Sequence, residues 1–220
     1  GSAGTQTIDY LNVRDSDASL GAALVCNLST EGCVNSGNNT NWSFPTHTVT
    51  GKAYSDEGFT PLTSKVVSLS LNGGAVTDSA TTDAGGMFTL SGATLTGGTI
   101  ITLFLDGETQ DAVTVTLGSG SSMTGIHLYQ NRLIVRSDSG SVALTNAHLR
   151  VADNSGDADI SAIYLMRDNN TALVVGDGKE LYIWSGDTFA PAGRVEAENL
   201  HLEGSYTQGN NLLTLSGALT

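Results

Sequence analysis

The chain has 220 residues, enough for one large or two small domains, and its formal net charge is -13 with nine lysines and arginines in total. Such an acidic surface repels nucleic acid and anionic membranes, so neither is an expected partner. No stretch approaches the roughly 18 apolar residues that a membrane-spanning helix needs, so membrane insertion is not expected. The abundance of Gly, Ser, Thr and Asn disfavours long helices and is typical of secreted β-rich proteins.

Residues 1–45 predict a β-solenoid end or a linker that contains a local disulfide. A strand is expected at 7–13, where apolar side chains begin to alternate. Cys26 and Cys33 are the two cysteines of the chain, and in an extracellular protein such close spacing predicts a disulfide. A zinc site is disfavoured because no third and fourth ligand lie nearby.

An aromatic pair follows this segment. Trp42 and Phe44 fall on the same face of an extended stretch. We expect them to seal the junction with the next region. The alternative is an exposed platform on which a sugar ring stacks, with Trp42 as its ligand-binding residue.

Residues 46–130 read as a series of short strands separated by turns. The turns 72–74 and 106–107 carry the Asn-Gly and Asp-Gly signals of hairpins. The expected strands are 49–54, 65–71, 75–81, 87–90, 99–105, 111–117 and 125–130. This density of strands and turns is typical of an all-β sandwich.

A tight turn lies at the centre of this region. Asp83 is expected to accept hydrogen bonds from backbone N–H groups a few residues on, and Gly85 or Gly86 supplies a positive φ. The alternative role for Asp83 is that of a calcium ligand.

The stretches 49–58 and 82–88 resemble the transthyretin-like, carboxypeptidase-regulatory or Cna-B type β-sandwich. The stretches 105–115, 128–136 and 178–193 resemble segments of very large repetitive bacterial surface proteins. These resemblances imply an Ig/transthyretin-like module that serves as a spacer or stalk.

Cna-B type modules sometimes carry an intramolecular Lys–Asn isopeptide bond promoted by a carboxylate. Here the resemblance offers Lys52 or Lys65 as the amine and Asn131 as the amide, with Glu57 or Asp83 as the acid. No motif in the sequence identifies one trio among them, so the bond remains an open alternative.

The spacing of strands and turns changes in residues 131–220. Apolar strands that end at Gly186, Gly204 and Gly217 recur at offsets of 18 and 13 residues. Loose repetition of this kind is typical of a parallel β-solenoid, in which successive coils stack. Further strands are expected at 133–136, 147–151, 160–166 and 172–175.

The whole chain is therefore expected to be all-β, with an Ig/transthyretin-like β-sandwich flanked by parallel β-solenoid-like segments. Residues 11–16 and 149–154 both place an apolar strand before an Asp-rich turn. This similarity predicts that the sandwich is inserted between two solenoid regions. We expect neighbouring repeats of the same parent chain to be its partners.

Two candidate ligand sites remain in the last region. Asp153, Asp157 and Asp159 alternate around a glycine, as oxygen ligands do in calcium loops, although an ordinary Asp-rich loop fits as well. Tyr182 and Trp184 are candidate sugar-stacking residues, with core packing as the alternative.

No catalytic motif is apparent, and the four histidines, His47, His127, His148 and His201, each stand alone in the sequence. The expected function is a non-catalytic spacer or stalk of a large secreted or cell-surface bacterial protein, with no cofactor required. One alternative is an adhesin module that binds polysaccharide, with or without calcium. The other is a fragment of a carbohydrate-active solenoid enzyme, which needs two carboxylates in a cleft.

Overall fold

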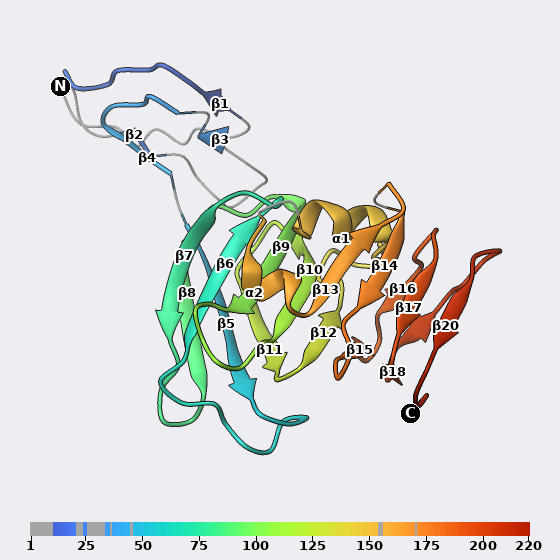
Figure 1. The fold of residues 1–220 in the computed structure, drawn as a ribbon. Coiled ribbons are helices and arrows are strands. Elements are labelled where there is room, and N and C mark those ends of the chain that lie inside the picture. Colours follow the sequence, from blue (N-terminus) through green and yellow to red (C-terminus); the bar gives the residue numbers. More distant parts are fainter. Residues whose placement is uncertain are drawn as a thin grey trace.

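The computed structural model describes residues 11–20, 24–25, 34–35, 37–44, 46–153, 156–169 and 171–220. Within these ranges the chain is mostly β-strand with two short helices, which confirms the expected all-β class. Figure 1 shows the strands of residues 46–220 gathered in one body.

A seven-stranded sheet forms the spine of this body, in the order β18-β15-β12-β10-β9-β6-β7 (Figure 1). Its strands are β6 (Val66–Leu71), β7 (Val76–Thr81), β9 (Gly97–Leu105), β10 (Val113–Ser119), β12 (Arg132–Val135), β15 (Glu180–Ile183) and β18 (Asn199–Leu202). The half from β7 to β10 is antiparallel, with hairpins at the predicted turns. The half from β10 to β18 is parallel. One sheet therefore runs through both 46–130 and 131–220.

A three-stranded sheet covers one face of the antiparallel half. Its order is β11-β5-β8, and its strands are β5 (His47–Tyr54), β8 (Met87–Ala93) and β11 (Met123–Tyr129). Every second side chain of β5 is buried, as the period of a half-buried strand requires. The turn before β8 is the predicted one, since Asp83 accepts hydrogen bonds from the N–H groups of Gly85 and Met87 at 2.7 and 2.9 Å.

Beyond β10 the chain winds through three sets of parallel strands. The first set is β12, β15 and β18. The second is β16 (Thr188–Phe189) with β19 (Ser205–Tyr206), and the third is β14 (Ala172–Val175), β17 (Val195–Ala197) and β20 (Leu213–Leu215). In the first set, a long step along the chain separates β12 from β15. Paired residues are 17 apart in the second set and 22 or 18 apart in the third.

The central strand β9 faces two hydrophobic cores, and its neighbour β10 contributes to one of them. On β9, Leu103 and Leu105 enter the core beneath the three-stranded sheet, whereas Phe104 enters a second core on the opposite face. Val113 and Val115 of β10 join this second core, together with side chains of the parallel sets. Because neighbouring side chains of a strand point to opposite faces, the two cores share β9.

The strand predicted at 147–151 is wrong, because these residues lie in helix α1 (Asn146–Asp153). The His148 N–H lies 3.4 Å from the Thr145 hydroxyl, while His148 Nδ1 accepts from the Thr145 N–H at 3.1 Å. This reciprocal arrangement is that of a helix N-terminal capping box. Leu149 and Ala152, three residues apart, are then buried together against the second core.

The strand predicted at 160–166 is half wrong. Its first residues belong to helix α2 (Ala158–Ser161), and only then does strand β13 (Tyr164–Arg167) begin, antiparallel to β14. Asp157 caps this helix, because its side chain accepts a hydrogen bond from the Asp159 N–H at 2.9 Å.

Short parallel pairs also occur near the N-terminus. Strand β1 (Asn12–Val13) pairs with β3 (Val34–Asn35), and β2 (Leu24–Val25) pairs with β4 (Trp42–Ser43). These pairs are 22 and 18 residues apart, as in the third parallel set. Cys26 and Cys33, with the predicted disulfide, lie outside the described residues, as does most of the predicted strand 7–13.

Candidate functional site

The three-stranded sheet ends at β11, and beyond this edge the spine sheet carries a strip of polar and aromatic side chains. Parallel register pairs Arg132 with Glu180 and Tyr182 with His201 across neighbouring strands. Trp184 directly follows β15 on the same side as Tyr182, two residues along. We call these side chains the outer strip.

Aromatic rings of the outer strip pack against Tyr129 of β11. Tyr182 stacks on His201 with ring centroids 4.5 Å apart and meets Tyr129 edge-on at 5.5 Å. Trp184 lies 6.2 Å from Tyr129, and the Arg136 guanidinium lies 5.2 Å from the Trp184 ring. Tyr129 and Tyr182 are 6% and 2% exposed. This aromatic cluster is therefore a small core of its own.

The phenols of this cluster stay protonated at neutral pH. Burial raises the pKa of Tyr129 to about 12. Burial, followed by a hydrogen bond to Glu203, raises the pKa of Tyr182 well above its ordinary value. Both hydroxyls are therefore hydrogen-bonding groups and not bases.

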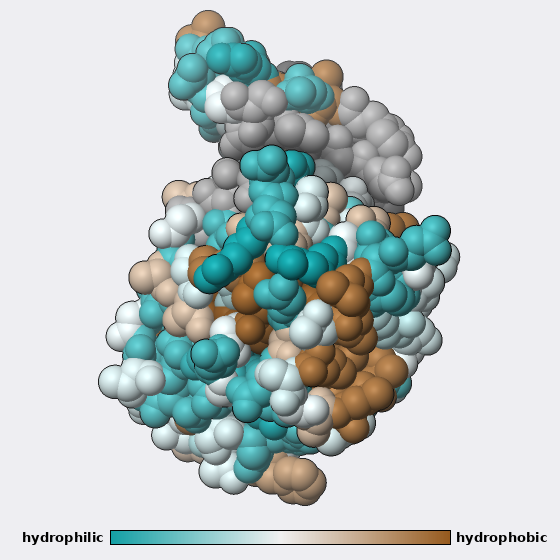
Figure 2. Space-filling model, turned by 45° about the vertical axis from the view of Figure 1, so that its right-hand side comes forward, coloured by the Kyte–Doolittle hydropathy of each residue, from teal (hydrophilic) through white to brown (hydrophobic). Residues whose placement is uncertain are grey.

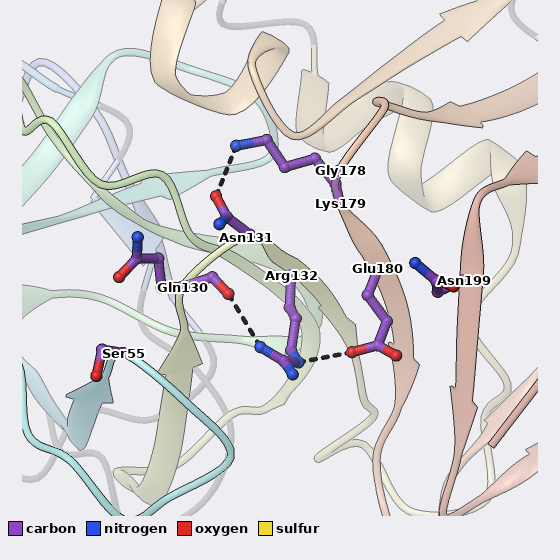
Figure 3. Close-up of a pocket in the computed structure, with 8 residues that line it drawn as sticks. All are labelled: Ser55, Gln130, Asn131, Arg132, Gly178, Lys179, Glu180 and Asn199. Carbon is purple, nitrogen blue, oxygen red and sulfur yellow. Dashed lines mark hydrogen bonds and ion pairs between the residues drawn. The ribbon is translucent and has the colours of Figure 1, made fainter. Parts of the chain in front are cut away.

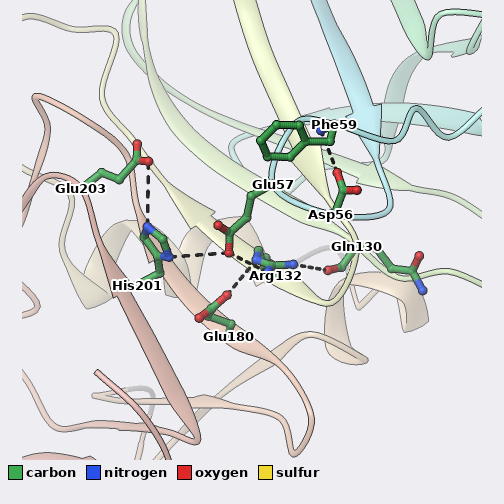
Figure 4. Close-up of polar contacts among 8 residues, drawn as sticks. All are labelled: Asp56, Glu57, Phe59, Gln130, Arg132, Glu180, His201 and Glu203. Carbon is green, nitrogen blue, oxygen red and sulfur yellow. Dashed lines mark hydrogen bonds and ion pairs between the residues drawn. The ribbon is translucent and has the colours of Figure 1, made fainter. Parts of the chain in front are cut away.

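Arg132 joins two glutamates beside the cluster (Figure 4). Its guanidinium donates to Glu57 Oε1 through Nη2 and contacts Glu180 Oε2 through Nε, both at 2.7 Å. His201 Nδ1 lies 3.6 Å from the same Glu57 oxygen, and its Nε2 lies 3.9 Å from Glu203. Glu57 follows β5, whereas Arg132, Glu180 and His201 belong to the parallel strands and Glu203 directly follows β18. The network therefore ties the two parts of the chain together.

A polar pocket of about 380 Å³ opens where β12 and β15 begin (Figure 3). Its lining side chains are mostly amides and charged groups: Ser55, Gln130, Asn131, Arg132, Gly178, Lys179, Glu180 and Asn199. Figure 3 shows Arg132 and Lys179 each directed toward lining residues. Such a lining fits a small polar ligand better than an apolar one.

Lys179 holds a second polar junction at this pocket. Its Nζ donates to Asp111 Oδ2 and to Asn131 Oδ1, both at 2.7 Å. The Lys179 and Asp111 side chains are only 15% and 25% exposed. Lys179 and Asn131 directly precede β15 and β12, and Asp111 lies two residues before β10; these three strands are neighbours in the sheet. The sequence did not single out Lys179, because Asp111 lies 68 residues away along the chain.

Two of the isopeptide candidates, Lys65 and Asn131, form polar contacts with other residues. Lys65 pairs with Glu108 at 3.0 Å, and Lys52 lies on β5. The Asn131 amide accepts its hydrogen bond from Lys179. A covalent bond at Asn131 stays an open alternative.

Among the described residues, one trio brings possible metal-ligating atoms together. One atom each of Glu57, Glu180 and His201 lie within 4.8 Å of one another. Both glutamates contact the Arg132 guanidinium, whose positive charge takes the place that a cation would fill. Glycoside hydrolysis needs two carboxylates that can act as acid and as base or nucleophile, and both carboxylates here are engaged in ion pairs. The geometry is that of a structural ion-pair network.

The three predicted calcium ligands bind backbone N–H groups. Asp157 caps α2, and Asp159 accepts from the Gly107 N–H at 2.7 Å. Burial raises the pKa of Asp153, although a hydrogen bond from the Met166 N–H opposes this shift. The described residues show no convergence of these three carboxylates within 4.8 Å. Calcium binding at this loop stays a prediction.

The three predicted sugar-stacking residues fall in two places. Tyr182 and Trp184 belong to the aromatic cluster, where Tyr182 is buried and Trp184 half-buried. Trp42 stacks on Phe44 at 6.0 Å, and its indole N–H donates to the Ser16 hydroxyl at 3.0 Å. A sugar-binding role for them also stays a prediction.

In the described part of the chain no helix combines the length and apolar character needed to cross a bilayer. No protein-family model, curated protein or solved structure matches this chain. Its function therefore has to be inferred from the geometry.

Proposed function

We propose that the chain is a non-catalytic structural segment, a spacer or stalk, of a large secreted or cell-surface bacterial protein. One observation supports this most directly: a single sheet runs from β7 to β18, and its central strand β9 serves two cores. Domains joined only by a small polar interface move relative to one another. A shared sheet prevents this motion, which is what a stiff spacer requires.

Within this proposal, residues 46–130 form an Ig/transthyretin-like β-sandwich and residues 131–220 form coils of a parallel β-solenoid. Two facing sheets around one core support the first assignment. Parallel sets with similar offsets support the second. The parallel pairs within 1–45 support a solenoid end before the sandwich. Neighbouring repeats of the parent chain are the proposed partners, and no cofactor is needed.

Unfolding followed by two probes tests the proposal. Trp42→Phe leaves Trp184 as the single tryptophan, so that its fluorescence reports on the aromatic cluster. Phe88→Ala removes a ring that is 2% exposed in the other core, at an expected cost of about 3–5 kcal/mol. If the body is one cooperative unit, this change lowers the midpoints of Trp184 fluorescence and far-UV circular dichroism equally.

The matched control is Thr89→Ala, an exposed neighbour on the same strand, which should change both midpoints little. A Trp184 transition that ignores Phe88→Ala would show two independent units and would contradict the stiff spacer.

The polar pocket favours one second candidate, a module that binds polysaccharide with or without calcium. It opens where β15 begins, at the opposite end of this strand from Trp184, and its amide and charged groups can bind sugar hydroxyls. A glycan array, probed with the chain in calcium and again in chelator, tests this candidate. Binding to one sugar class that Asn199→Ala abolishes would support it, and loss in chelator would implicate the loop of Asp153 and Asp159.

A further inference from the structure

The three sets of parallel strands together form an array. The edges at one end of this array are paired with other strands, and within the described residues those at the other end are not. At its first strands, β10 pairs with β12, and β13 pairs with β14. At its last strands, β19 and β20 have a partner on one side only among the described residues. Beyond β18 the described chain supplies one short segment, residues 218–220, which pairs with β18 through the Leu200–Leu219 bridge and three backbone hydrogen bonds of Ala218 and Thr220. We call β18 with its partner segment 218–220, β19, and β20 with the preceding Leu212 the open end.

Exposure rises along the array at equivalent positions. Leu181, Leu200 and Leu219 follow one another in register, and they are 0%, 2% and 63% exposed. In the third set, Val195 is fully buried while its partner Leu213 is half-buried. At these equivalent positions each apolar side chain is covered by the coil that follows it, and the side chains of the last coil lack this cover.

The open end is apolar. Its exposed leucines are Leu202, Leu212 and Leu219, at 38%, 60% and 63%. Figure 2, in which this side of the molecule is turned forward, shows a hydrophobic patch beside hydrophilic surface. Apolar surface next to unpaired strand edges is a template for another strand.

We infer that the open end is an interface for one further β coil of the same kind, which adds a parallel strand to each of the three sets. The inference rests on the proposed solenoid. The register sets the size of this partner, because Glu180 pairs with Asn199 and Leu200 with Leu219, an offset of 19 residues each time. Its alternate apolar side chains cover Leu212 and Leu219.

A second copy of this chain does not fit as the occupant. Head-to-tail stacking needs a free parallel edge at the first strands, and β10 and β13 already occupy those edges. Two open ends placed face to face wind in opposite senses along the array. Their strands would therefore meet antiparallel, against the parallel register of every set.

Amide hydrogen exchange on an extended chain tests the inference. A copy of residues 202–220 is appended after Thr220, which continues the 19-residue register. The Leu212 carbonyl and the Ser216 N–H bond to β17, so the N–H groups of Leu213 and Leu215 point away from it. These two amides should exchange at least about tenfold more slowly in the extended chain.

The control extension carries serine in place of each copied leucine and should give no protection. Equal exchange rates in the two extended chains would overturn the inference. So would a stable dimer of the unextended chain, seen by light scattering, that Leu219→Glu dissociates, because a second copy would then cover the open end. Two-probe unfolding of the unextended chain is independent of both results, so it separates failure here from failure of the proposed function.

Discussion

At the scale of single residues, Lys179 connects the starts of three neighbouring strands through Asp111 and Asn131. Lys179→Met should lower the free energy of unfolding by about 1–3 kcal/mol, because a half-buried carboxylate loses its charged partner. Chemical denaturation of the variant measures this cost. Lys52→Met is the control, since Lys52 takes part in none of the described ion pairs, and an equal loss in both variants would contradict the role of Lys179.

Asp153 should make stability depend on pH in the opposite sense to a paired carboxylate. Burial raises its pKa in the folded state, so the folded chain binds this proton more tightly than the unfolded chain. Its contribution is most favourable below its ordinary pKa of about 3.9 and is lost as the pH rises through the folded value.

Asp153→Asn removes this titration and keeps an oxygen for the Met166 N–H. The variant should therefore match the parent near pH 3 and exceed it in stability near pH 7, with unfolding free energies measured across that range. A parent more stable than the variant at pH 7 without calcium would contradict the assignment.

Local residue roles could be predicted from the sequence, and long-range ones could not. Asp83 accepts hydrogen bonds from N–H groups within four residues, so the residues of the turn alone were enough to predict these bonds. Arg132 meets Glu57 across 75 residues, and only the sheet order brings them together. For the same reason His201, an isolated strand residue in the sequence, lies within a charged network.

At the scale of elements, close approach of the backbone requires glycine just beyond the end of one strand. A Cβ at Gly204 would lie 2.3 Å from the Trp184 carbonyl oxygen, so backbone must shift. Gly204→Ala should cost about 2–3 kcal/mol in thermal or chemical unfolding. Gly97→Ala is the control, because its Cβ would meet nothing closer than 3.9 Å, and it should cost under about 0.5 kcal/mol. Similar costs for both would show that the coil turn tolerates a side chain.

Strands with clear alternation and hairpin turns were predictable, and α1 was not. Ala147, Leu149 and Val151 alternate as in a strand, while Leu149 and Ala152 have helical spacing, so periodicity alone leaves both readings open. The cap formed by Thr145 and His148 decides for the helix. The sequence signal was faint because His148 stands where a capping box usually has Glu or Gln.

At the scale of the whole molecule, the net charge of -13 should make stability rise with salt. Repulsion among 22 acidic residues exceeds what nine lysines and arginines neutralise, and salt screens it. Raising NaCl from 0.01 to 0.15 M should raise the melting temperature by about 2–4 °C, roughly 1 kcal/mol. Scanning calorimetry measures the shift. A decrease would mean that ion pairs such as Arg132–Glu57 outweigh the repulsion.

The continuity of the spine sheet could not be predicted, although the change of strand spacing near residue 131 was visible. Each strand has its own pattern, but no pattern states which strand lies beside it. The parallel pairing of β10 with β12 passes over β11, which turns away into the other sheet. The two patterns of strand spacing therefore appeared in the sequence as separate regions, although their strands share one sheet.

The offset of 19 residues from β15 to β18 also fixes how many residues the array uses for each added strand. Adding one strand lengthens a sheet by about 4.8 Å. The same residues pulled straight would span about 60 Å. A coil peeled from the open end by tension would thus release more than ten times the length that it contributes when folded. The folded array is therefore short for its mass, and its end-to-end length can increase greatly when coils unfold.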